Sequence, residues 1–91
     1  EVETYDTQVG ELLQALEASG ELANTLVIVT SDHGMPFPRV KGHNYHTANH
    51  IPCVVRWPQG VFRPGRKSTE LLSMIDWAPT LLELFGVDGP K

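Results

Sequence analysis

The chain has 91 residues, of which 41% are hydrophobic and 20% charged, and its formal net charge is −4. This composition is typical of a globular protein rather than a disordered one. The negative balance without a basic run argues against nucleic acid as a partner, and no apolar stretch is long enough to span a membrane.

A helix is the first predicted element. Apolar residues recur at three- and four-residue spacing from Val2 to Leu16, which predicts an amphipathic helix. Gly20 is placed to end this helix in the left-handed conformation. Gly10, in the helix interior, costs about 1 kcal/mol relative to alanine and therefore indicates close packing on a neighbouring element.

The run from Leu26 to Thr30 is apolar and β-branched, which predicts a buried strand. It is followed directly by Ser31, Asp32, His33 and Gly34, a polar tip that packing does not require. Because ligands collect at the carboxyl edges of strands in open α/β sheets, Asp32 and His33 are the first candidates for chemistry.

A polar loop without a sustained period follows over residues 35–50. Connections this long are usually functional or disordered, and the aromatic and histidine content of this one favours function. Residues 51–57 predict a second strand, in which Cys53 is expected as a small core residue and permits no internal disulfide. Residues 58–67 predict a turn-rich excursion to the surface.

Residues 69–75 are short and apolar and predict either a strand or a helix. Asp76 is expected to cap a helix that carries Pro79 in its first turn and ends at Gly86. Alternating helices and strands favour an α/β layer structure. Because parallel strand pairs are normally covered on both faces, these few elements are expected to be the C-terminal part of a larger α/β sheet.

Asp32 and His33 could both bind one metal ion if the backbone turned between them, and Gly34 makes such a turn easy. Two ligands do not hold a catalytic cation, so further ligands are expected from elsewhere. Oxygen-rich ligands would suit Ca²⁺ or Mg²⁺, whereas His33 shifts the preference toward Mn²⁺ or Zn²⁺. The alternative is that Asp32 caps a turn and His33 is an ordinary loop histidine.

Lys41 lies in the same loop. An ammonium group near a bound cation needs an anion between them, and a sulfate or phosphate ester would be such an anion. The alternative is a solvated surface lysine. The histidines of this loop could donate a proton to a leaving group, or they could simply hydrogen-bond to the backbone; they are His43, His46 and His50. Trp57 and Trp77 are expected to be packing residues.

Four segments in order resemble the sulfatase family, within the alkaline-phosphatase-like superfamily. They are residues 5–13, the strand and tip Asn24-Thr25-Leu26-Val27-Ile28-Val29-Thr30-Ser31-Asp32-His33-Gly34, the segment from Lys41 to Tyr45 with Ile51-Pro52, and Asp76-Trp77-Ala78-Pro79-Thr80-Leu81-Leu82 through Val87. Met35-Pro36-Phe37-Pro38 is similar to the sulfamidase and heparan-type branch. The resemblance implies an α/β fold, with residues 1–91 as an incomplete domain: the C-terminal part of an alkaline-phosphatase-like sheet with flanking helices.

The resemblance also implies roles. Asp32 and His33 would be two ligands of a divalent cation, usually Ca²⁺ in the family, with Mn²⁺ or Mg²⁺ as alternatives. Lys41 would be catalytic, contacting the sulfate as the ester bond breaks. His50 ends the segment where the family often has Gly-Gly-x-Arg, and it is a candidate substrate contact. The implied partners are a small sulfated sugar or aryl sulfate and the remainder of the parent chain, in a periplasmic, secreted or lysosomal compartment.

One family feature is missing from the sequence. Sulfatases use a formylglycine made from cysteine or serine in a C/S-x-P-x-R motif, and Cys53-Val54-Val55-Arg56 lacks the proline and the spacing. The nucleophile and the other metal carboxylates are therefore expected N-terminal to Glu1, and the chain alone is expected to be inactive. The alternatives are a phosphonate or phosphodiester hydrolase of the same superfamily and a non-catalytic excised module.

Overall fold

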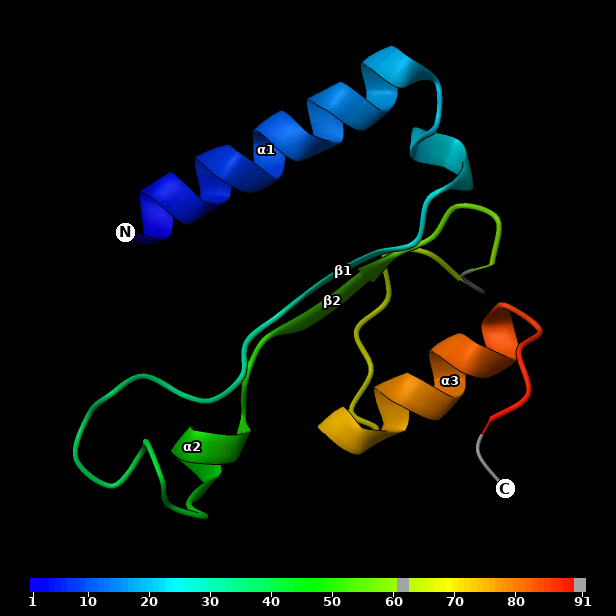
Figure 1. Cartoon of the computed structure of the whole chain (residues 1–91). Helices are drawn as coiled ribbons and strands as arrows, with labels where there is room; N and C mark the ends of the chain where they lie inside the picture. Colours follow the sequence, from blue (N-terminus) through cyan, green and yellow to red (C-terminus); the bar gives the residue numbers. More distant parts are fainter. Residues whose placement is uncertain (61–62, 90–91) are drawn as a thin grey trace.

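The computed structural model describes residues 1–60 and 63–89. Its helices and strands follow the predicted order, except that a one-turn helix, His46–Asn49, lies within the predicted loop (Figure 1). The order is α1 (Val2–Ser19), the 3₁₀-helix η1 (Leu22–Asn24), β1 (Val27–Thr30), α2 (His46–Asn49), β2 (Cys53–Arg56), the 3₁₀-helix η2 (Met74–Asp76) and α3 (Trp77–Leu84). Val61 and Phe62, within the predicted excursion, lie outside the described residues.

Helix α1 ends where the sequence predicts. Gly20 has a φ of 78°, and its N–H donates to the carbonyl of Glu17 at 3.0 Å. Only glycine adopts this left-handed conformation without steric cost. The expectation for Gly10 was wrong, since a Cβ there would meet nothing within 4 Å.

The two strands pair antiparallel, from Val27 opposite Arg56 to Thr30 opposite Cys53. The expectation of a larger sheet was argued from parallel strand pairs, and these two strands do not form such a pair. Parallel strands are usually joined by a crossover helix, and the connection over residues 31–52 contains only the single-turn helix α2. Cys53 is exposed, which corrects its expected place in a core.

Helix α3 carries Pro79 in its first turn and stops at Gly86, whose φ is 65°. Asp76 precedes α3 but does not cap it with its side chain. Its Oδ2 instead accepts a hydrogen bond from the N–H of Ser73 at 2.9 Å. Of the ambiguous segment 69–75, only its last two residues are helical, as the start of η2.

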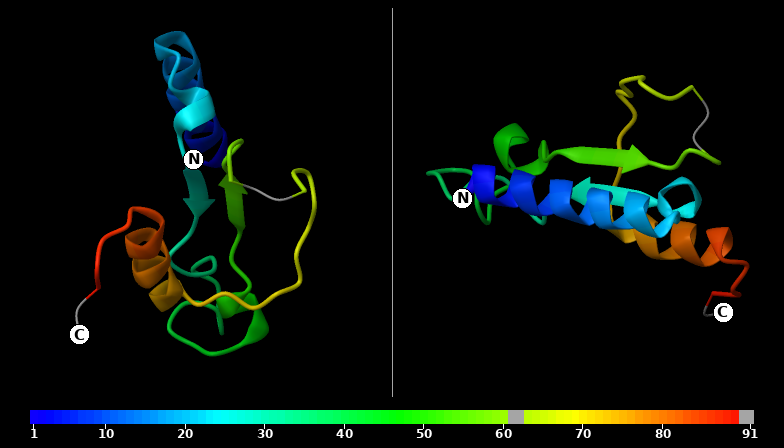
Figure 2. Two further views of the ribbon diagram at one scale, coloured as in Figure 1. Left: turned by 90° about the vertical axis from the view of Figure 1, so that its right-hand side faces the viewer. Right: turned by 90° about the horizontal axis from the view of Figure 1, so that it is seen from above.

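The described elements are loosely assembled. The accessible surface is 8215 Å², against about 5,300 Å² for a compact protein of this mass. The radius of gyration is 15.7 Å, against about 12 Å expected. Helices α1 and α3 lie on opposite sides of the sheet (Figures 1 and 2), and within the described residues neither brings a Cα within 8 Å of a strand.

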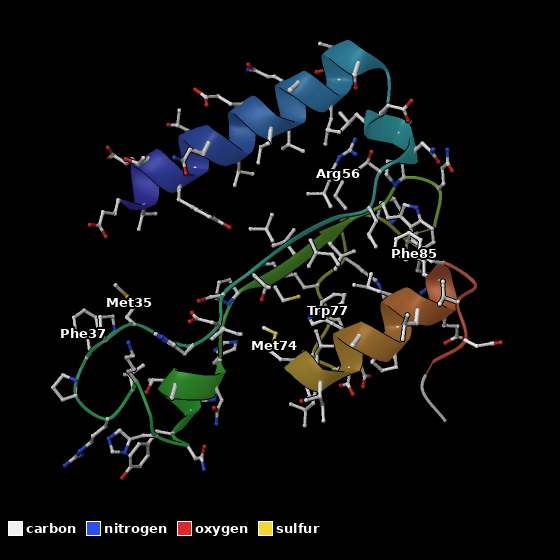
Figure 3. The ribbon with its side chains drawn as sticks, in the orientation of Figure 1. Met35, Phe37, Arg56, Met74, Trp77 and Phe85 are labelled. Carbon is white, nitrogen blue, oxygen red and sulfur yellow. The ribbon has the colours of Figure 1, made fainter. Side chains whose placement is uncertain are left out.

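Apolar side chains consequently stay uncovered. Met74 and Trp77 point from the η2–α3 segment toward the sheet (Figure 3), yet Trp77 is only half-buried. Val40 and Ala48, 8% and 6% exposed, are the only buried apolar residues in the described ranges. No described helix has both the length and the hydropathy that a membrane span requires.

Candidate functional site

The tip of β1 is held by side-chain hydrogen bonds to the backbone. Thr30 Oγ1 donates to the carbonyl of Pro52 at 2.8 Å, which joins the ends of the two strands. Ser31 Oγ donates to the carbonyl of His33 at 2.8 Å, and the N–H of His33 donates to Asp32 Oδ1 at 2.9 Å. These bonds turn the chain directly after the strand, and the turn places the Asp32 and His33 side chains together.

The imidazole of His33 is oriented by the next residue. Its Nδ1 lies 2.6 Å from the carbonyl oxygen of Gly34. A carbonyl oxygen only accepts hydrogen bonds, so Nδ1 carries the hydrogen. The other nitrogen, Nε2, lies 3.3 Å from Asp32 Oδ2. In this tautomer Nε2 carries a lone pair, so it and the carboxylate oxygen are two donor atoms that one metal ion could share.

The distance between these two donor atoms is suitable for binding one divalent cation. Donor atoms that share one Zn²⁺, Mn²⁺ or Ca²⁺ ion lie about 3–3.6 Å apart at ordinary coordination distances. A metal-binding histidine usually donates its other ring N–H to a carbonyl or carboxylate, as His33 does. The Asp32 side chain is 82% exposed and that of His33 38%, so an ion can reach both. Among the described residues, no third Asp, Glu, His or Cys completes a metal-binding group.

Gly34 joins the tip of β1 to the far end of the loop. Its N–H donates to the carbonyl of Ala48 at 3.1 Å. A Cβ at Gly34 would overlap the carbonyl oxygen of Thr47 and lie 2.6 Å from Val40 Cγ1. Glycine is thus required here by close approach of the backbone. The long loop is ordered by this contact, and sequence reasoning did not single out Val40 or Ala48.

Lys41 is exposed on the loop, and no contact joins it to Asp32 or His33 within the described residues. The structure therefore brings together the predicted metal pair but not the predicted lysine, whose role stays a prediction.

The three loop histidines lie on and beside α2. The rings of His46 and His50 are 4.7 Å apart, and those of His43 and Tyr45 are 6.0 Å apart. All three histidines are exposed. Each is accessible to a substrate, but none contacts the Asp32–His33 pair within the described residues. Their predicted part in proton transfer or substrate contact stays a prediction.

Known proteins similar to this chain are mainly sulfatases. The chain is 40% identical over 86 residues to an ulvan-active sulfatase of Formosa agariphila and 39% identical over 86 residues to the human N-sulphoglucosamine sulphohydrolase, and each alignment covers 94% of the chain. It is also 40% identical over 96 residues, 98% of its length, to a 2,3-bisphosphoglycerate-independent phosphoglycerate mutase of Roseobacter denitrificans.

The chain is much shorter than these relatives. It spans 14%, 17% and 17% of their respective lengths. No solved structure matches it significantly. The model of the sulfatase family, in contrast, matches residues 1–87, nearly the whole chain and all four segments that carry the resemblance. The chain belongs to the sulfatase family.

Proposed function

We propose that the chain acts within a longer hydrolase of sulfuric esters or sulfamates, to which it contributes two metal ligands and a sulfate-binding lysine. The observation that carries this proposal is the Asp32–His33 pair. Its two donor atoms are 3.3 Å apart, and the second ring nitrogen of His33 is already engaged by Gly34. The family match over residues 1–87 supplies the reaction class.

Asp32 Oδ2 and His33 Nε2 would hold a divalent cation, Ca²⁺ by family resemblance, with Mn²⁺ or Mg²⁺ as alternatives. When bound, such an ion would polarise the sulfate and offset its negative charge. The chain's own residues prepare this role. Ser31 and Gly34 hold the turn and the ring of His33 in place, so these groups would lose little conformational freedom when a metal ion binds.

Lys41 would bind the sulfate oxygens that the cation does not hold, and His50 would contact the substrate beside it. Both side chains belong to the loop that the Gly34–Ala48 hydrogen bond fastens to the tip of β1. An ammonium group on this loop stabilises the charge that develops as the sulfur–oxygen bond breaks.

The nucleophile would come from another part of the longer protein, as a formylglycine. Within this chain Cys53 lies in β2 without the C/S-x-P-x-R motif that formylglycine formation requires. The substrate would be a small sulfated sugar, as the name of the N-sulphoglucosamine relative suggests, or an aryl sulfate, as the name of a relative called arylsulfatase K from Xenopus laevis suggests.

A phosphate-ester enzyme is the second candidate, because a phosphoglycerate mutase is also among the relatives, with 40% identity over 96 residues. Sulfate and phosphate esters present the same tetrahedral oxyanion to a metal ion and a lysine. A substrate panel with the longer protein decides between them. Turnover of a sulfate ester or sulfamate supports the sulfatase proposal, and turnover of phosphate esters alone overturns it.

The metal pair can be tested on the chain itself. Mn²⁺ at substoichiometric concentration should broaden the NMR signals of residues 31–34 first, because paramagnetic relaxation reports even weak binding by two donors. Asp32→Asn should abolish this broadening, whereas Asp88→Asn, an equal loss of charge at an exposed acid, should leave it unchanged. Broadening that starts on the acidic helix α1, or that survives Asp32→Asn, would exclude the pair as a metal site.

A further inference from the structure

Residues 37–43 form two successive turns that share Val40. The N–H of Val40 donates to the carbonyl of Phe37 at 3.1 Å, and the N–H of His43 donates to the carbonyl of Val40 at 3.3 Å. Arg39 and Gly42 occupy the third position of each turn, with φ values of 66° and 77°. Positive φ at this position is the mark of a type II turn and favours glycine.

Gly42 meets this requirement, but Arg39 does not. A residue with a Cβ is crowded by its neighbouring carbonyl in this conformation and loses stability relative to glycine. Strained positions of this kind are concentrated at ligand-binding sites, where the side chain is needed. Arg39 thus keeps a charged side chain at a backbone position that glycine would fill with less strain.

Val40 fixes both turns to the candidate site. It is 8% exposed, and its Cγ1 lies 2.6 Å from the point that a Cβ on Gly34 would occupy. Arg39 and Lys41, on either side of this anchor, are exposed. The two basic side chains therefore lie on one loop, and Val40 packs this loop against Gly34, the glycine that follows Asp32 and His33. Figure 3 shows this loop, with Phe37 labelled, at the end of the sheet beyond β1.

Charge is strongly segregated along the sequence. Residues 1–32 carry seven acidic residues and no lysine or arginine. Residues 33–69 carry no acidic residue, but six of the seven lysines and arginines: Arg39, Lys41, Arg56, Arg63, Arg66 and Lys67. Neither Arg39 nor Lys41 pairs with a carboxylate in the described part of the chain. Two unpaired cations beside one buried residue favour an anionic ligand with more than one charge.

We propose that Arg39 is a specificity-determining residue that binds a second anionic group of the substrate, while Lys41 binds the reacting sulfate. This inference rests on the proposed function for the role of Lys41. The planar guanidinium of Arg39 suits a sulfate or a carboxylate equally well. The loop would therefore select substrates that carry two oxyanions, such as a sulfated sugar with a further sulfate or a uronic carboxylate, over a substrate with one.

A binding titration tests this selection without relying on hydrolysis. The probes are one disaccharide in monosulfated and disulfated forms, titrated into the chain with NMR detection. The disulfated form should bind about fivefold more tightly, because it makes one additional charge-assisted hydrogen bond that solvent partly screens. Arg39→Gly should abolish this ratio of affinities, and Arg39→Lys, which keeps the charge but not the planar guanidinium, should keep only part of it.

The glycine substitution is chosen because it relieves the backbone at Arg39 while removing the charge. A lost ratio therefore cannot come from backbone strain, and the Gly34 amide signal checks that the loop contact persists. Arg63→Gly is the matched control, since Arg63 also has a positive φ, of 59°. This control should leave the ratio unchanged.

The proposal is overturned if the wild-type chain does not distinguish the two probes, if the ratio survives Arg39→Gly, or if Arg63→Gly abolishes it equally. A third probe with one sulfate and one carboxylate identifies the group that Arg39 binds. If it binds as tightly as the disulfated form, Arg39 accepts either a sulfate or a carboxylate; if it binds more weakly, Arg39 prefers sulfate. If the longer protein hydrolyses no sulfate ester while the Arg39-dependent ratio holds, the proposed reaction fails and the anion selection stands.

Discussion

The N–H of Gly34 donates to the carbonyl of Ala48 at 3.1 Å, so the loop that leaves the tip of β1 returns to it. Val40 and Ala48, the two buried apolar residues of the described chain, both lie at this contact. In a chain with so little core, this contact fixes where the loop carries Arg39, Lys41 and the histidines. The geometry of the candidate site therefore depends on a glycine that is not itself a ligand.

Gly34→Ala should open this contact. The new Cβ would overlap the carbonyl oxygen of Thr47 and crowd Val40 Cγ1, and overpacking of this kind costs about 1–3 kcal/mol. The expected result is that the amide of residue 34 loses about tenfold or more of its protection against hydrogen exchange, measured by NMR.

Gly10→Ala is the control for this experiment. A Cβ at Gly10 meets nothing within 4 Å, so the same substitution should instead stabilise α1 by about 1 kcal/mol. Unchanged exchange at residue 34 in the Gly34→Ala variant would contradict the close approach.

His33 should carry its hydrogen on Nδ1 whenever the ring is neutral. The carbonyl of Gly34, 2.6 Å from Nδ1, accepts that hydrogen, and Asp32 faces the other nitrogen. Long-range ¹⁵N–¹H correlation spectra distinguish the two tautomers. His46 and His50, whose ring nitrogens contact no carbonyl oxygen among the described residues, are the internal comparison. A neutral His33 protonated on Nε2 would contradict the orientation on which the metal proposal depends.

Local sequence patterns were enough to predict α1, its end at Gly20, both strands and α3, because periodicity and capping act over one or two turns. The sulfatase family was also identified correctly from its segments. The adjacency of Asp32 and His33 is local too, since neighbouring residues need only one turn to meet.

Contacts between distant segments were not predictable in the same way. The relative orientation of the two strands depends on the path that residues 31–52 take between them. The contact of Val40 with Gly34 depends on the same path. Cys53 was expected to be buried in a core, and Gly10 was expected to pack closely on a neighbouring element. The described residues contain no element that covers either of them. Both errors have one cause: apolar periodicity predicts which face of an element should be covered, but not whether the covering element is present.

The 91-residue chain should not hydrolyse a sulfate ester. The described residues contain only two adjacent donors for a cation, and the sequence has no C/S-x-P-x-R motif for a formylglycine. With Ca²⁺ or Mn²⁺ supplied, release of the aryl alcohol from an aryl sulfate should equal the rate without protein. Turnover that Asp32→Ala removes would show that the chain is catalytically sufficient and contradict this expectation.

Leu13→Ala should have different effects in two contexts. Leu13 is only half-buried on α1, and α1 brings no Cα within 8 Å of the sheet in the described residues. Truncation in the isolated chain should therefore change the free energy of unfolding by less than about 1 kcal/mol.

In the longer protein we expect the apolar face of α1 to be covered, and the same truncation should then cost about 2–5 kcal/mol. Urea unfolding of both proteins measures the difference. Gln14→Ala, one position along on the exposed face, should stay within about 0.5 kcal/mol in both contexts. Equal, small effects of Leu13→Ala in both proteins would mean that this face of α1 stays in contact with solvent and that its apolar stripe has no packing partner.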